Sequence, residues 1–248
     1  MRSVHGGRHE LGQNFLVHTP TLRSIRDLVA ATRGPILELG PGDGALTTEL
    51  ISLRRDLRAI EIDEHRVHRL RRRHPELDVQ HADALRVRFD RPVVVGNIPF
   101  HITTPLLRRL LSQRDWQHAV LLTQWEVARK RAGVGGATMM TAQSAPWYSF
   151  QLHGRVPAHR FRPVPSVDGG ILSITRRGSP LLPASDQRGY EHFVRDVFTG
   201  RGHGLERIVR ARGGRAGAVR RAGIAPDALP RDLSPEQWAA LWQVLGER

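Results

Sequence analysis

The segment Glu38–Gly44 restricts the possible folds of this chain more than any other. It reads Glu-Leu-Gly-Pro-Gly-Asp-Gly, continues a short apolar run at Pro35–Leu39 and precedes the helix-like Ala45–Leu53. Glycines at such a junction let the backbone turn tightly and approach a nucleotide-like ligand, because they carry no Cβ. The segment therefore predicts a strand, a ligand-binding loop and a helix, as in α/β folds.

Strands and helices alternate through the first two thirds of the chain. We expect further strands at Arg58–Ile62, Val93–Val95 and Ala119–Leu122, and helices at Glu64–Arg73 and from Thr104-Pro105 onward, with the threonine as cap. This order of elements implies a doubly wound, mostly parallel sheet.

The pattern changes near residue 176. Arg176–Pro183 contains a glycine and two prolines without periodicity, which is typical of a linker. Only short helices are expected beyond it, the last of them starting at the capping box Ser234–Gln237. Its apolar residues share one face, so they are expected to be core rather than a platform for bases: Trp238, Leu241, Trp242 and Leu245. We therefore expect a cofactor-binding catalytic domain at 1–178 and a small α-helical domain at 179–248.

The charge of the chain indicates a polyanionic partner. The net charge is +14, from 38 basic and 24 acidic residues. Lys130 is the only lysine. A GC-rich genome explains a preference for arginine over lysine, but it does not by itself explain the excess of positive charge.

Composition also excludes several kinds of chemistry. The chain has no cysteine, so it cannot attack a base through a thiolate as C5-cytosine methyltransferases do. No His-Glu-x-x-His pattern occurs, and no metal site is expected. No apolar run approaches the roughly 20 residues of a membrane span, and Met1–Glu10 lacks the apolar core of a signal peptide. A cytoplasmic protein is expected.

Two acidic residues lie where predicted strands end, and they extend the glycine-loop site. Glu61 is placed to accept hydrogen bonds from ribose hydroxyls, and Asp83 from the amine of a cofactor adenine. The neighbours Ile62 and Ala84 are included in this expected cofactor site. Gly40, Gly42 and Ala45 also satisfy the dinucleotide fingerprint, so these residues alone leave a dehydrogenase possible.

The tetrapeptide Asn97-Ile98-Pro99-Phe100, after the fourth strand, favours an amino-methyltransferase. An adenine amine is a poor nucleophile, because its lone pair is delocalised into the ring. The Asn97 side-chain oxygen and the Ile98 carbonyl are suited to accept hydrogen bonds from the two N–H groups of this amine. These bonds would localise the lone pair on the nitrogen. Pro99 would stiffen the turn, and Phe100 would stack on the extruded base. The alternative without a catalytic role is that this tetrapeptide is only a turn between a strand and a loop.

These motifs together resemble the Erm family, methyltransferases that confer macrolide–lincosamide–streptogramin B resistance by modifying N6 of an adenine in the peptidyl-transferase loop of 23S rRNA. The stretches that carry the resemblance are Leu11–Leu16, Glu38–Gly44, Ala59–Asp63, Gly96–Arg109, Gln124–Lys130 and Arg160–Asp168. It implies the Rossmann-like fold of class I methyltransferases and the cofactor S-adenosylmethionine.

The resemblance also implies roles that spacing alone does not. Asn14 and Leu16 would lie over the methionine and ribose end of the cofactor, with Gly40, Glu61, Asp83 and Asn97 completing the set. Phe161 would close the target pocket opposite Phe100. From the residues alone, Phe161 would be a loop anchor packed against the prolines, and this alternative remains open.

Two alternatives remain open. Small-subunit rRNA adenine dimethyltransferases share the fold and cofactor residues, but they usually have Asn-Leu-Pro-Tyr-Asn at Asn97–His101 and Pro-Pro-Lys-Val-Asp near Pro163–Asp168. A second alternative is a protein that has the methyltransferase fold and binds RNA but has lost the methyltransferase activity. It would be expected to have a broken Asn97–Phe100 motif, and the motif is intact.

Basic clusters are the expected contacts to 23S rRNA. The protein is expected to act as a monomer. The candidates are Arg108, Arg109, Arg129, Lys130, Arg131, Arg160 and Arg162. Arg69–Arg73 is either a further RNA contact or a solvated helix face. Arg207–Arg221 is either a soluble helical cap or an electrostatic arm.

Overall fold

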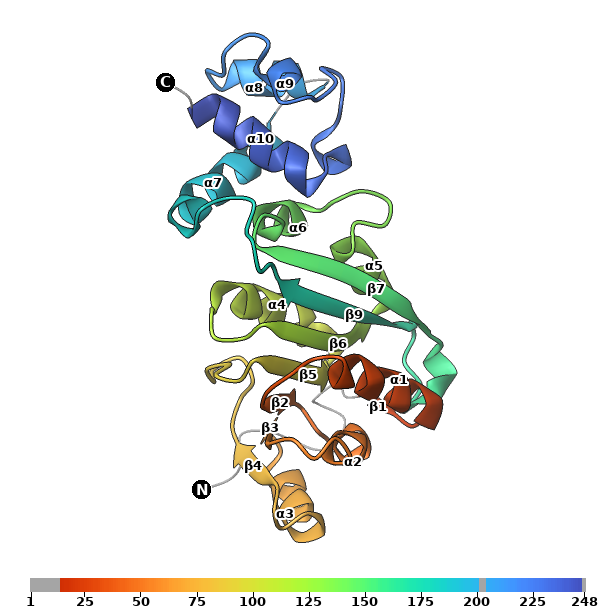
Figure 1. The fold of residues 1–248 in the computed structure, drawn as a ribbon. Coiled ribbons are helices and arrows are strands. Elements are labelled where there is room, and N and C mark those ends of the chain that lie inside the picture. The colour runs from red at the N-terminus through yellow and green to blue at the C-terminus, as the bar shows by residue number, and fades with distance from the viewer. Residues whose placement is uncertain (1–13, 201–203, 247–248) are drawn as a thin grey trace, which may run out of the picture. The chain divides into compact units, whose positions relative to one another are not determined.

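The structure, a computed structural model, describes residues 14–200 and 204–246 (Figure 1). The predictions for Met1–Glu10 and for Leu11–Gln13 lie outside these residues. A seven-stranded sheet has the order β4-β3-β2-β5-β6-β9-β7, and a separate pair joins β1 to β8. The strands of the large sheet are β2 Ile36–Leu39, β3 Leu57–Glu61, β4 Asp78–His81, β5 Val93–Asn97, β6 His118–Gln124, β7 Tyr148–Val156 and β9 Gly169–Arg176. The pair consists of β1 Phe15–Leu16 and β8 Phe161–Arg162.

Strand directions confirm the predicted fold class. The neighbours β4, β3, β2, β5 and β6 run parallel, and β9 is antiparallel to β6. The chain leaves β2 toward β3 on one side and later returns to β5 on the other. In doubly wound sheets, a ligand crevice lies at such a reversal, outside the carboxyl ends of the strands.

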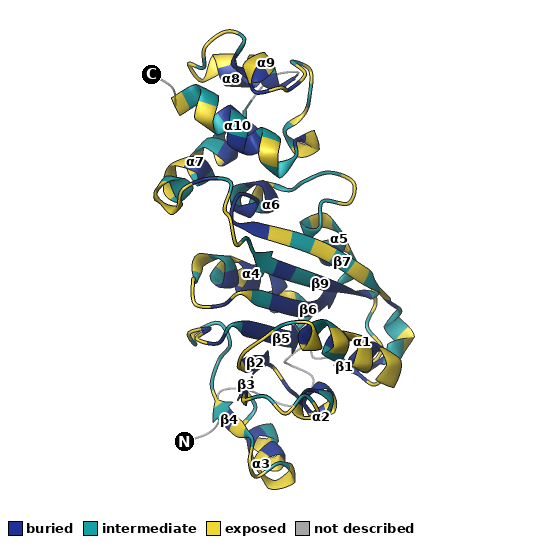
Figure 2. Ribbon diagram, viewed as in Figure 1, coloured by how far each residue is buried: buried dark blue, intermediate teal, exposed yellow. Residues whose placement is uncertain are grey.

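Helices cover both faces of the sheet. Helices α1 (Thr19–Ala30) and α2 (Ala45–Ile51) pack on one face, where their apolar residues join Val93, Val95 and Leu122 in one core cluster. Since side chains alternate between the two faces of a strand, the other residues of β5 and β6 point to the opposite face. Both strands are largely buried (Figure 2). A sheet buried on both sides explains why the central strands read as continuous apolar runs.

The remaining helices are α3 Glu64–Arg73, α4 Thr103–Ser112, α5 Trp125–Arg131, α6 Met139–Ser144, α7 Gln187–Phe198, α8 Leu205–Ala211, α9 Ala218–Arg221 and α10 Pro235–Gly246. The start of α4 differs from the prediction: the helix begins at Thr103, after a 3₁₀ turn at Phe100–Ile102, without a side-chain cap. Throughout the described ranges, no helix combines the length and apolar character that crossing a bilayer requires.

The chain forms two compact units, Met1–Ala128 with Gln151–Thr175, and Arg129–Phe150 with Arg176–Arg248. The second crossing lies close to the boundary expected at 178, but the second unit also includes Arg129–Phe150. Hydrogen bonds between this segment, which contains α6, and residues after Arg176 explain the grouping. Tyr190 Oη donates to the Ala142 carbonyl at 2.9 Å, and Trp147 Nε1 donates to the Leu182 carbonyl at 3.0 Å.

The start of α10 confirms the predicted capping box. Gln237 N donates to Ser234 Oγ at 3.2 Å, and Ser234 N donates to Gln237 Oε1 at 2.9 Å. Trp238 is buried and stacks on Phe198 at 5.8 Å between ring centroids. It is therefore part of the core of the second unit.

Candidate active site

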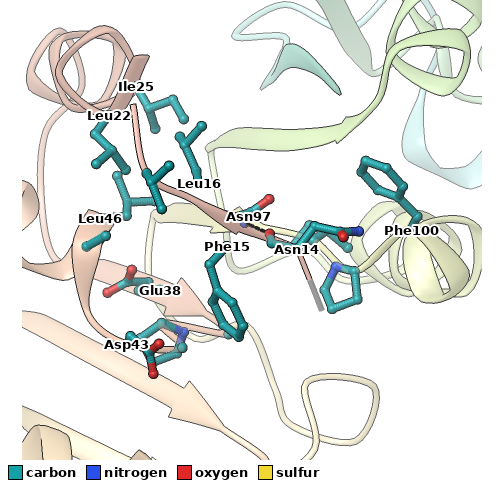
Figure 3. Close-up of a pocket in the computed structure, with 17 residues that line it drawn as sticks. Asn14, Phe15, Leu16, Leu22, Ile25, Glu38, Asp43, Leu46, Asn97 and Phe100 are labelled. Atoms are coloured by element: carbon teal, nitrogen blue, oxygen red, sulfur yellow. Dashed lines mark hydrogen bonds between the residues drawn. The ribbon is translucent and has the colours of Figure 1, made fainter. Parts of the chain in front are cut away.

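Two cavities in the first unit, at the carboxyl ends of β2, β3 and β5, adjoin at the shared lining residues Gly40, Ile98 and Pro99; we call the two together the groove. The first is also lined by Asn14, Leu16, Gly42, Asn97 and Phe100 (Figure 3). The second is also lined by Glu61, Ile62, Asp83 and Ala84. The structure thus brings together every residue expected at the cofactor site.

The glycine loop is shaped by backbone conformation and by close packing. Gly40 and Gly42 have φ values of +66° and +58°, a region that side chains with a Cβ rarely adopt. A Cβ on Gly42 would lie 2.7 Å from Cε1 of Phe15. The Phe15 ring therefore rests on the loop, and only glycine allows that contact.

Glu61 links the glycine loop to the end of β3. One carboxylate oxygen accepts from the Gly42 N–H and the other from the Asp63 N–H, both at 3.0 Å. Each oxygen has a second lone-pair site, so the carboxylate retains acceptor capacity for ligand hydroxyls. Asp83 is engaged locally, because its Oδ1 accepts from Leu85 N at 2.8 Å.

Glu38 is a buried carboxyl group to which the sequence analysis gave no role. It lies at the end of β2, lines the first cavity and is only 1% exposed. Burial raises its pKa to about 8; the Thr47 hydroxyl opposes the rise, and the charge of Glu61 adds to it. The signal available in the sequence was an acidic residue inside an otherwise apolar strand.

The Asn97 amide is oriented by the chain entering β1. Its Nδ2 donates to the Asn14 carbonyl at 2.8 Å (Figure 3). Because a carbonyl only accepts, this contact fixes which end of the amide faces Asn14 and leaves Oδ1 as an acceptor for another group. Ile98 N donates to the Leu122 carbonyl at 2.9 Å, which ties the tetrapeptide to β6.

Phe100 and Phe161 have different environments. Phe100 is half-buried and lines the first cavity, where a stacking face is available. Phe161 is completely buried in the core, with its Cζ 2.9 Å from where a Gly169 Cβ would be, and lines neither cavity. This placement does not support the predicted stacking role and fits the alternative of a loop anchor.

Several arginines expected at the RNA surface are engaged by the protein itself. Arg109 Nε donates to the Val87 carbonyl at 3.1 Å, and Arg131 Nη1 donates to Thr138 Oγ1 at 2.6 Å. Arg160 Nη1 donates to Thr21 Oγ1 at 3.2 Å. Arg129 and Arg162 make bonds to nearby carbonyls, whereas Arg108 and Lys130 are exposed. Contact with RNA stays a prediction for all seven candidates.

Three arginines of α3 contact Asp43 of the glycine loop, a role that was not expected from the sequence. Arg69 pairs with its carboxylate, Arg66 Nε lies 3.6 Å from the same oxygen, and Arg73 donates to the Asp43 carbonyl at 3.1 Å. The Arg66 guanidinium also lies 4.4 Å from the centre of the Phe15 ring. We call Arg66, Arg69, Arg73 and Asp43 the loop clamp.

A doubly wound sheet with a glycine loop after β2, an acid at the end of β3 and Asn97–Phe100 at the end of β5 defines a class I methyltransferase. The chain belongs to the ribosomal RNA adenine dimethylase family, which it matches over residues 4–247. It is an rRNA adenine methyltransferase with S-adenosylmethionine as cofactor.

Individual relatives agree with this assignment. The chain is 52% identical to a mycinamicin-resistance protein of Micromonospora griseorubida, over 98% of this chain and 80% of the relative. It is 49% identical to an rRNA adenine N-6-methyltransferase of Corynebacterium diphtheriae, over 85% of each. The crystal structure of the 23S rRNA methyltransferase ErmE matches with a TM-score of 0.84 at 32% identity, covering 94% of this chain and 100% of that one. The resemblance to resistance methyltransferases is confirmed.

Proposed function

We propose that this protein transfers one or two methyl groups to N6 of a specific adenine in the peptidyl-transferase loop of 23S rRNA, conferring resistance to macrolides, lincosamides and streptogramin B. The observation that carries the proposal is the oriented Asn97 amide beside Phe100, in a chain 52% identical to a mycinamicin-resistance protein. Small-subunit methyltransferase A of Chlorobium limicola is less similar, at 34% identity over 77% of this chain. This difference favours the large-subunit target.

The groove fits the cofactor. The glycine loop leaves room for close backbone approach, Glu61 retains acceptor capacity for ribose hydroxyls, and one buried oxygen of Glu38 has no hydrogen-bond partner in the described residues. When bound, S-adenosylmethionine supplies an electrophilic methyl group. We propose Asn14, Leu16, Gly40, Gly42, Glu61, Ile62, Asp83, Ala84 and Asn97 as the residues that hold it.

Asn97 and its neighbours would act on the target amine. The free Oδ1 of Asn97 and the Ile98 carbonyl accept hydrogen bonds from the two N–H groups of the amine. This concentrates the lone pair on the nitrogen. Phe100 holds the extruded base by stacking. No general base with a tuned pKa is required, since the nitrogen becomes acidic once it is methylated and its proton leaves to water.

The setting of this reaction follows from the substrate. We propose that the protein works in the cytoplasm, where rRNA is made, and as a monomer, because all residues of the proposed groove come from one unit of one chain. Sedimentation equilibrium checks the monomer, and a concentration-dependent increase in mass would contradict it.

Transfer of a labelled methyl group to separated rRNAs tests the function. Purified protein with labelled S-adenosylmethionine should label protein-free 23S rRNA at N6 of one adenine and leave 16S rRNA unlabelled. Label confined to 16S rRNA would support the small-subunit alternative instead. RNA binding without any label would support the alternative of an RNA-binding protein that has lost the methyltransferase activity.

A further inference from the structure

A third cavity, of about 350 Å³, lies at the carboxyl end of β6 in the first unit. It is lined by Gln124, Trp125, Glu126, Arg155 and Ser166–Asp168. All of these residues except Arg155 fall in stretches that carried the family resemblance. None of them lines the groove described above.

Strand register places this cavity beside the reacting tetrapeptide. Asn97, the last residue of β5, pairs with Leu122 of β6, and β6 continues two residues further to Gln124. Parallel strands are about 4.8 Å apart. The third cavity therefore lies at the end of the strand next to the one that ends at Asn97, and it shares no lining residue with the first two cavities.

Trp125 provides the flat wall of the cavity and is held firmly. The backbone N–H of Trp125 donates to the Asp168 carbonyl at 2.8 Å. A Cβ on Gly170 would lie 3.2 Å from Cε3 of the indole and 2.7 Å from Cβ of Ala128, so glycine at 170 lets α5 approach the sheet closely. The indole is half-buried and lines the cavity, and the Arg155 guanidinium lies over its ring, with Cζ 5.6 Å from the ring centre.

Arg155 gives the cavity a fixed positive charge. Its Nε donates to Asp168 Oδ2 at 2.6 Å, and Asp168 Oδ1 accepts from Ala158 N at 2.8 Å. The backbone bond from Ala158, followed by Arg155, holds the pKa of Asp168 below its usual range, so the carboxylate stays charged and keeps Arg155 in place. The Arg155 side chain is 60% exposed and has further donors available for a phosphate.

Gln124 adds a group that reads hydrogen-bonding edges. Its amide carries both donors and an acceptor, and it has no side-chain hydrogen bond within the described residues. A flat aromatic wall, a free amide and a positioned guanidinium are the chemistry of a nucleotide site: stacking, edge recognition and phosphate contact.

We infer that this cavity holds a nucleotide adjacent to the target adenine; the inference rests on the proposed function. Extruding the adenine removes the stacking partner of its neighbour, and Trp125 replaces that partner. Gln124 faces the edge of the neighbouring base and Arg155 faces its phosphate. Recognition of the flanking base would help the protein select one adenine among many.

RNA hairpins with an abasic site on either side of the target adenine test this inference. On the intact hairpin, Trp125→Ala should raise KM roughly five- to a hundred-fold, and Trp125→Phe should stay close to wild type, because phenylalanine still stacks. An abasic site on one flank should weaken wild type by a similar factor and weaken Trp125→Ala little further. Arg88→Gln, an exposed residue paired with Asp115 away from the cavities, is the matched control.

Losses from Trp125→Ala and from the abasic sites that simply multiply would overturn the inference, as would an unchanged KM. Affinity for S-adenosylmethionine checks that each variant is folded. If Trp125→Ala fails this check, Trp125→Leu, which fills the space without a π-face, takes its place in the same comparison. Wild type that methylates no rRNA would refute the proposed function and this inference together; wild type that methylates 23S rRNA but ignores its flanking bases refutes only the inference.

Discussion

Asn97 is the residue on which the proposed chemistry depends, because its Oδ1 is kept free by the contact of Nδ2 with Asn14. Asn97→Ala removes an acceptor aimed at the developing charge. We expect kcat to fall by about 10²–10³, while affinity for RNA changes little. Single-turnover methyl transfer and filter binding measure the two quantities. Turnover equal to wild type would contradict the mechanism.

Glu38 links stability to pH. Its folded-state pKa of about 8 lies above the ordinary value of 4.5, so the protonated carboxyl stabilises the fold fully below pH 4.5, and this contribution disappears as the pH rises through about 8. Glu38→Gln keeps a neutral group at all pH values. Relative to this variant, wild type should lose on the order of 2–5 kcal/mol of unfolding free energy between pH 5 and 9.

Urea unfolding of the cofactor-free protein at several pH values measures the difference in unfolding free energy between wild type and Glu38→Gln. The contributions of the other titrating groups cancel in this difference. Parallel curves for wild type and Glu38→Gln would show that Glu38 is ionised in the folded protein.

At this scale, the sequence predicted residues that belong to a local motif and failed where tertiary packing decides. Gly40, Glu61, Asp83 and Asn97 each lie at or just after the carboxyl end of a strand, and parallel strands bring these ends together. Phe161 and Arg109 look the same in sequence whether they face a ligand or the protein. Only the packing of Phe161 under Gly169 and the bond of Arg109 to Val87 separate these possibilities.

Among the elements, α3 acts on the cofactor site through the loop clamp. Asp43→Asn removes the charge that Arg66 and Arg69 share, so the loop should sample more conformations before binding. We expect affinity for S-adenosylmethionine to fall about two- to ten-fold, in keeping with a small network of surface ion pairs.

Calorimetric titration measures that affinity. Asp78→Asn breaks a comparable ion pair with Arg58, remote from the loop, and should leave the affinity unchanged. Equal effects of the two substitutions would show that the clamp has no specific role.

Elements were predictable where their signals are local. The apolar runs of β2, β5 and β6 and the capping box of α10 follow from short-range patterns. The grouping of Arg129–Phe150 with the C-terminal helices does not, because it depends on bonds such as that of Tyr190 to Ala142, 48 positions apart in sequence. We propose that this segment and the C-terminal helices form one folding unit.

For the whole molecule, the net charge of +14 predicts RNA binding dominated by phosphate contacts. Each neutralised phosphate contributes about −0.7 to −0.9 to the slope of log affinity against log salt concentration. We expect a steep negative slope for 23S rRNA fragments and a much smaller one for S-adenosylmethionine, both measured by titration at several salt concentrations. A flat slope for RNA would contradict the electrostatic account.

Methylation of one large-subunit adenine is the central claim for the molecule as a whole. Mass spectrometry of rRNA from cells that express this chain tests it most directly, because it gives the position and number of methyl groups together. We predict N6 methylation of a single adenine in the peptidyl-transferase loop of 23S rRNA, absent from cells expressing Asn97→Ala. An unmodified 23S rRNA, or new methyl groups in 16S rRNA alone, would contradict the claim.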